Sequence, residues 1–150
     1  MDKLTYIKSP LLKTVKAGTV LLHTCDTTGS WKSPISLKLK KKYPNIYSEY
    51  QSWCSKNPNE LIGSYLKFKD DGVIITCLFT GTGQGDTKEL MLRNTQKAIR
   101  AFIQTLPYKS TVNSTKINPG LFNVPWDYTE KVIKACLSDR PDIQWIIYEV

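Results

Sequence analysis

The only histidine of the chain and a nearby carboxylate stand in one polar segment that follows an apolar run. His23 comes directly after Val20–Leu22, and Asp26 lies three residues further along. Histidine side chains titrate near neutral pH, so His23 suits general acid–base catalysis, in which it protonates a leaving oxygen or positions a water. Asp26 could orient His23 or activate that water. Each also has a structural interpretation, in which His23 hydrogen-bonds to backbone and Asp26 caps N–H groups of its turn.

A second polar turn, Asn118–Trp126, follows the strand-like pair Lys116–Ile117. Within it, Gly120 permits a close backbone approach, and Asn123 tolerates left-handed geometry better than most residues. In open α/β sheets, ligands bind outside the carboxyl ends of the strands. The two turns therefore predict one cleft whose walls are rich in backbone N–H groups, which suits a phosphorylated ligand.

The spacing of apolar residues predicts the strands and helices that must position these turns. Strands are expected at residues 3–8, 18–25, 63–69, 73–80, 114–118 and 143–149, with the last one closing the sheet. Helices are expected to begin at Ser33-Pro34, at Pro44 and at Asp86, where Glu89 stands in capping-box spacing, and a last helix is expected from Trp126 to Leu137. Loops or turns are expected at residues 57–59, 70–72 and 81–85. Strands that alternate with helices predict a mixed sheet between two helical layers.

The overall composition predicts one soluble domain. The chain has 150 residues, 41% of them hydrophobic, and it lacks the run of roughly 20 apolar residues that spans a bilayer. Its first residues lack the pattern of a signal peptide, so we expect a cytoplasmic protein, with the nucleus as a second location. The four cysteines, at positions 25, 54, 77 and 136, show no metal-finger spacing and are expected to be reduced, mostly core residues. No metal-ligand cluster is predicted.

The formal net charge of +8 favours acidic partners and says little about the fold. The densest basic run is Lys38–Lys42, which we interpret as the solvated face of a helix. Ile35, Leu37 and Leu39 also alternate as in a strand, but the lysines and the cap at Ser33 favour the helix. The alternative function of the run is attraction of a polyphosphate ligand or RNA.

Both turns resemble the macrodomain family, which binds ADP-ribose and its derivatives. Macrodomains carry Ser-x-Gly-(Ile/Val)-(Phe/Tyr)-Gly-x-Pro after a late strand, and Asn118–Pro125 is similar to it. His23 stands where most macrodomains have asparagine, as in the branch of ADP-ribose-1''-phosphate phosphatases and single-domain ADP-ribosyl-acid-ester hydrolases. Leu4–Lys8, Ile75–Thr80 and Trp145–Val150 resemble the first, a central and the last strand of the family. The resemblance covers essentially the whole chain and implies a three-layer α/β/α sandwich with a mixed central sheet.

The resemblance implies that the two turns together form the site. His23 and Asp26 are the candidate catalytic residues. The candidate ligand-binding residues are Gly29, Ser30, Trp31, Lys32, Asn118, Gly120, Leu121, Phe122 and Asn123. Phe122 stands where the family places an aromatic ring against the distal ribose, with core packing as its alternative. By family position the loop 81–85 lies near the cleft. Neither a cofactor nor a metal is implied.

Three departures from the family pattern bear on activity. Pro10 replaces the acid or amide that reaches the adenine, and it cannot make that hydrogen bond. Lys32-Ser33-Pro34 replaces the glycines of the phosphate loop, although Lys32 could compensate with its charge. Phe122 occupies the position of the catalytic aspartate of the ester hydrolases, which disfavours their mechanism, whereas the phosphatases carry an aromatic residue there.

Three functions remain open at this point. The leading one is hydrolysis of a phosphate ester on an ADP-ribose metabolite, ADP-ribose-1''-phosphate, by a monomer that uses His23, backbone donors and water. The second is a binding module that recognises ADP-ribose or a related nucleotide without turnover, which the lost glycines favour. The third is an RNA-binding protein with a basic surface, which lacks any RNA-recognition signature.

Overall fold

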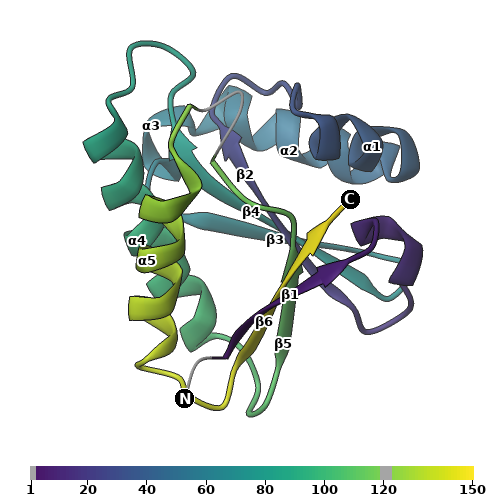
Figure 1. Ribbon diagram of the computed structural model, residues 1–150. Helices are drawn as coiled ribbons and strands as arrows, with labels where there is room; N and C mark the ends of the chain where they lie inside the picture. Colours follow the sequence, from purple (N-terminus) through teal and green to yellow (C-terminus); the bar gives the residue numbers. More distant parts are fainter. Residues whose placement is uncertain (1–2, 119–122) are drawn as a thin grey trace.

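The fold is built on a six-stranded sheet with helices on both of its faces (Figure 1). The computed structural model describes residues 3–118 and 123–150. The strands are β1 (Leu4–Lys8), β2 (Val20–Asp26), β3 (Tyr65–Asp70), β4 (Val73–Gly81), β5 (Thr111–Ser114) and β6 (Gln144–Glu149). The helices are the short 3-10 helix η1 (Leu11–Thr14), α1 (Pro34–Lys42), α2 (Pro44–Lys56), α3 (Pro58–Leu61), α4 (Lys88–Gln104) and α5 (Trp126–Leu137).

The strand order is β1-β6-β5-β2-β4-β3, and each neighbouring pair is parallel except β3 with β4. Helices α4 and α5 cover one face, where Ile99 and Ile133 are buried against the sheet. Helices α1 and α2 cover the other face through Leu39 and Tyr50. The predicted three-layer α/β/α sandwich with a mixed sheet is therefore confirmed.

The parallel direction of the strands decides where a site can form. Strands β2, β4 and β5 run the same way, so their carboxyl ends meet at one edge of the sheet. The segments that follow these three ends are residues 27–33, 82–87 and 115–125. Both turns with candidate site residues, after β2 and after β5, thus emerge at the same edge.

The starts of two helices, α3 and α4, differ from the predictions. Residues 57–59 were expected to be a loop, but Pro58 begins the short helix α3, because its fixed φ suits a first helical position and Leu61 becomes buried. The predicted capping box of Asp86 and Glu89 is wrong. Thr87 is the N-cap of α4, and its side chain accepts from the Leu90 backbone N–H at 3.1 Å. The Asp86 carboxylate instead accepts from the backbone N–H of Thr82 in the preceding loop.

Two strand predictions also need correction. The expected strand at residues 114–118 lies earlier, at β5, because Ser114 is the last residue paired with β6 and Asn118 has a φ of +72°, which no strand accommodates. The C-terminal strand β6 does not close the sheet. It lies between β5 and β1, so β1 forms the edge. The hairpin turn at residues 70–72 is confirmed, with positive φ at Asp71 and Gly72.

The layered core predicts a large cost for truncating Phe102 on α4, whose side chain is fully buried and packs against the ring of Tyr65. Phe102→Ala should lower the free energy of unfolding by about 3–5 kcal/mol, because it removes apolar contacts and leaves a cavity. Leu90→Ala is the matched control on the same helix, since Leu90 is exposed, and it should cost less than about 1 kcal/mol. Equal losses in denaturant unfolding would contradict this arrangement.

Candidate active site

A cleft of about 370 Å³ opens at the edge where β2 and β5 end. The start of α1 forms one wall, Pro10 and Leu11 form a second, and residues 115–118 form a third. His23 and Thr24 of β2 lie at its floor. Lys38 and Lys116 bring positive charge to it, although Lys116 also pairs with Glu149 at 3.0 Å. Size, position and charge suit a phosphorylated small molecule.

His23 occupies a different place from the one expected. It is the fourth of seven residues in β2, and it is only 1% exposed instead of standing in an open polar turn. Its Nδ1 lies 3.0 Å from the hydroxyl of Ser36, and its ring stands edge-on to Trp31, with centroids 4.6 Å apart. The cleft therefore meets His23 at its floor, not at its mouth.

Ser36 connects His23 to the beginning of α1. The Ser33 side chain accepts from the Ser36 backbone N–H at 3.3 Å, so the predicted N-cap is confirmed. The hydroxyl of Ser33 also lies 2.7 Å from that of Ser36. A chain of hydroxyls thus leads from the cleft wall to Nδ1 of the buried histidine. Such a chain can pass a proton between His23 and a ligand beside Ser33.

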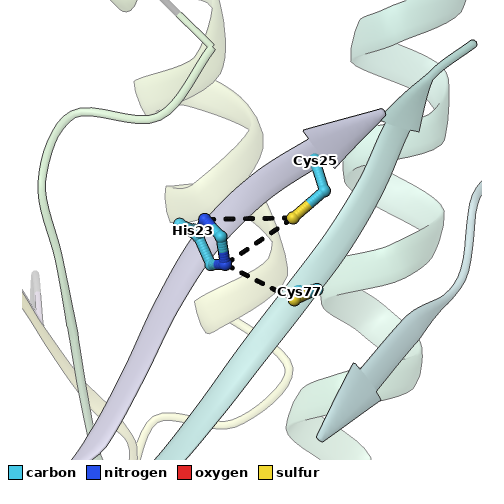
Figure 2. Close-up of side chains that lie close together, drawn as sticks. All are labelled: His23, Cys25 and Cys77. Atoms are coloured by element: carbon cyan, nitrogen blue, oxygen red, sulfur yellow. Dashed lines mark hydrogen bonds between the residues drawn. The ribbon is translucent and has the colours of Figure 1, made fainter. Parts of the chain in front are cut away.

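Two cysteines lie at the other ring nitrogen of His23 (Figure 2). Its Nε2 is 3.4 Å from Sγ of Cys77 on β4 and 3.6 Å from Sγ of Cys25 on β2. Burial disfavours ionisation of Cys77, but the hydrogen bond from Cys25 and the neighbouring imidazole outweigh it and lower the pKa of Cys77 to about 6. Burial, together with Cys77, raises the pKa of Cys25.

This cluster was not predicted from the sequence. All four cysteines are buried and free of disulfides, as expected, but no metal-ligand group was predicted. His23, Cys25 and Cys77 nevertheless place their ligand atoms within 4.8 Å of one another. The signal was the parallel pairing of β2 with β4, which sets His23 beside Cys77, and it becomes visible only once the strand register is known.

Asp26 uses its carboxylate within its own turn. Oδ1 accepts from the backbone N–H of Thr28 at 2.9 Å, and the Asp26 backbone carbonyl accepts from the hydroxyl of Tyr50 at 2.8 Å. A Cβ on Gly83 would lie 3.1 Å from Asp26 Oδ2, so the carboxylate faces the loop after β4. These contacts match the capping interpretation, and no hydrogen bond joins Asp26 to His23 among the described residues. Its catalytic role stays a prediction.

Helix α2 holds Gly29 and Trp31 of the first turn in place. Gly29 has a φ of +84°, and its carbonyl accepts from Tyr47 and from Gln51 at 3.2 and 3.1 Å. Trp31 is 2% exposed and packs against Tyr47 and the fully buried Tyr50, so its indole belongs to the core. The side chain of Lys32 is exposed. Ser30, half-buried, and Lys32 are thus the members of this turn best able to face solvent or a ligand.

The second turn is anchored at both ends. Asn118 is 2% exposed, and its amide donates to Thr95 on α4 at 2.9 Å and to Thr129 on α5 at 3.4 Å. Its backbone carbonyl accepts from the Val124 N–H at 3.1 Å. Asn123 has a φ of +57°, as its left-handed tolerance suggested. Gly120, Leu121 and Phe122 lie outside the described residues, so their predicted roles stay predictions.

The loop after β4 lies beside the first turn. The Asp86 carboxylate accepts from the backbone N–H groups of Thr82 and Gly83, both at 2.9 Å. A Cβ on Gly83 would come within 2.7 Å of Thr28, so only glycine fits there. The loop after β4 therefore packs on the first turn. None of its residues lines the cleft, so the nearness of residues 81–85 to the ligand stays a prediction.

Both the sequence and the fold of the chain resemble those of known proteins. No protein-family model matches the chain. An ADP-ribose 1''-phosphate phosphatase of Meyerozyma guilliermondii is 32% identical, covering 89% of this chain and 94% of its own length. One from Candida albicans is 33% identical, covering 86% and 90%. The macrodomain of Mycobacterium tuberculosis DarG superposes with a TM-score of 0.81 at 22% identity, covering 100% of this chain and 99% of its own.

The chain belongs to the ADP-ribose 1''-phosphate phosphatase branch of the macrodomain family. Thermosipho africanus DarTG, solved in complex with ADP-ribose, has the same fold, with a TM-score of 0.79 at 15% identity over all of this chain and 42% of its own. Two of the residues that depart from the family pattern, Pro10 and Pro34, are exposed and line the cleft of this macrodomain. Neither can donate a backbone hydrogen bond there.

The anchoring of the second turn by Asn118 predicts a combined effect on stability and binding. Asn118→Ala should lower the free energy of unfolding by about 1–3 kcal/mol, because the buried hydroxyls of Thr95 and Thr129 lose the amide that donates to them. Since the turn is also released, ADP-ribose should bind more weakly in calorimetry. Asn123→Gly is the control in the same turn: it accepts the positive φ and should preserve both quantities. An Asn118→Ala protein with unchanged stability would refute the anchoring role.

Proposed function

We propose that this macrodomain binds ADP-ribose-1''-phosphate in the cleft and hydrolyses its terminal phosphate ester. The observation that carries the proposal is the match to proteins named ADP-ribose 1''-phosphate phosphatase over nearly their whole length, which includes 94% of the one from Meyerozyma guilliermondii. The cleft supports it, because it lies where open α/β sheets bind ligands and has a helix start in its wall. Water attacks phosphorus, the bond to the ribose oxygen breaks, and phosphate and ADP-ribose leave.

The start of α1 is the best place for the transferred phosphate. The nine-residue helix has no acidic residue in its first turn, and the Ser33 hydroxyl stands at its end. The positive end of the helix dipole favours an anion there. With the phosphate beside Ser33, the hydroxyls of Ser33 and Ser36 connect it to His23 Nδ1. His23 then acts as general acid or base through this chain.

This role predicts that phosphate release depends on His23. His23→Ala should lower turnover by about 10²–10⁴-fold, the range for a lost general acid or base, while the affinity for ADP-ribose changes much less. Ser36→Ala removes the hydroxyl next to Nδ1 and should lower turnover in the same direction. The measurements are phosphate release and ADP-ribose calorimetry on folded variants. Wild-type turnover in His23→Ala would exclude the role.

A second function, ADP-ribose binding without turnover, is favoured by one observation: Lys32-Ser33-Pro34 stands in place of the glycines of the phosphate loop, and Pro34 lines the cleft. If the wild type binds ADP-ribose but releases no phosphate, glycines at these three positions test whether a lost phosphate cradle is the reason. Phosphate release by the glycine variant would support that explanation. Continued inactivity would favour the binding module.

The exposed position of Pro10 predicts weaker binding than is usual in the family. A lost hydrogen bond to a charged group is worth roughly 1.5–3 kcal/mol, or on the order of ten- to a hundredfold in affinity. Pro10→Asp should therefore tighten ADP-ribose binding by about that factor in calorimetry, with Pro10→Ala as the control that removes the ring without adding an acceptor. Equal affinities for the two variants would refute the missing contact.

Location in the cytoplasm and RNA binding stay predictions.

A further inference from the structure

The ligand atoms of His23, Cys25 and Cys77 already have the spacing of a metal site (Figure 2). Zinc binds imidazole nitrogen at about 2.0–2.1 Å and thiolate sulfur at about 2.3 Å. In a tetrahedron with those bond lengths, nitrogen and sulfur ligands lie about 3.6 Å apart. The distances from Nε2 to the two sulfur atoms are 3.4 and 3.6 Å. An ion can therefore be accepted with little movement of the two strands.

We propose that His23 Nε2, Cys25 Sγ and Cys77 Sγ bind one Zn²⁺ beneath the cleft. Two thiolates and a neutral imidazole cancel the charge of a dication, which matters because the three side chains are at most 2% exposed. Cu⁺ also prefers thiolates, but the same donors would leave it with a net negative charge in the core. Charge balance thus selects zinc.

The surroundings of His23 are those of a metal-bound histidine. A ligating histidine usually donates its second N–H to an oxygen, which fixes its orientation. Here Nδ1 lies 3.0 Å from the hydroxyl of Ser36, and the ring is held edge-on by Trp31. Zinc on Nε2 makes His23 a permanent donor to Ser36. Only the metal-free form then has His23 available to take up a proton.

A small cavity borders Cys25 and Ser36, both of which contact His23. A cavity of about 10 Å³, lined by Cys25, Trp31 and Ser36 among others, has room for one water at most. The buried indole N–H of Trp31 has no hydrogen-bond partner among the described residues. A zinc-bound water in this cavity would complete the coordination and give that N–H an acceptor.

The test measures metal binding without substrate, so its result is independent of whether the chain hydrolyses phosphate. Reduced, metal-free full-length protein is incubated anaerobically with Zn²⁺, desalted and analysed for metal content. We expect about one zinc per chain, and a melting temperature roughly 5–10 °C higher than that of the metal-free protein. Cys25→Ser and Cys77→Ser should lose both effects. Cys54→Ser and Cys136→Ser are matched controls, because these buried cysteines lie outside the cluster, and both should bind like the wild type.

Cobalt provides a second measurement that does not depend on how well the variants fold. Wild-type protein with Co²⁺ should show the thiolate charge-transfer and visible bands of a tetrahedral site. A wild type that binds no zinc, equal zinc loss in Cys54→Ser and Cys77→Ser, or binding of Cu⁺ without Zn²⁺ would each overturn the proposal. So would a Cys25–Cys77 disulfide that persists under the reducing conditions of the assay.

Discussion

The parallel pairing of β2 with its neighbours is the constraint on which the other features depend. Strand β2 pairs with β4 along nearly the whole length of β2, and with β5 through Leu21 and Asn113. Because the strands run the same way, their following loops gather at one edge and enclose one cleft. The same register sets His23 beside Cys77. Reversing or shifting β2 would remove both the cleft and the buried cluster.

The loops at this edge are held mainly by their own polar side chains and by α2. By residue type, Asp26 and Asn118 are candidates for ligand contacts. However, the Asp26 carboxylate accepts from Thr28, and the Asn118 amide donates to threonine hydroxyls on α4 and α5. Tyr50 reaches from α2 to the Asp26 carbonyl, and burial raises its pKa, so it remains a donor. We therefore propose that backbone N–H groups, Ser33 and the lysines around the cleft recognise the ligand.

Much of the fold could be predicted from sequence, because the apolar spacing reflects which faces are buried. The long stripe of α4 and the continuous apolar run of β4 led to correct elements. The failures have local causes. A left-handed residue at 118 ends the strand early, Pro58 starts a helix in an expected loop, and the Asp86 carboxylate serves the loop before it instead of the helix after it.

The site was predicted at the level of its loops and less well at the level of its side chains. Residue type indicated that both turns emerge at one edge of the sheet, because turns after parallel strands share an edge. Of the described candidates in these turns, His23 and Asn118 line the cleft, whereas Asp26, Gly29, Ser30, Trp31 and Lys32 do not. It could not indicate that Trp31 is core, which depends on packing against α2, or that His23 is almost fully buried beside Ser36. Nor could it join Cys25 to Cys77, which are distant in sequence and meet only through strand register. The roles of residues 120–122 lie outside what the structure describes.

We propose that the ligand occupies the cleft at the carboxyl ends of β2 and β5. Backbone NMR of the labelled protein during titration with ADP-ribose can locate the bound ligand. A ligand in the cleft should concentrate the shift changes at Thr24, at residues 33–35 and at residues 115–118, which line the cleft. A second pocket lies at the amino ends of the same strands, lined by Lys16–Val20 and Thr111 among others. Saturable changes confined to that pocket, with the cleft residues unmoved, would contradict the account.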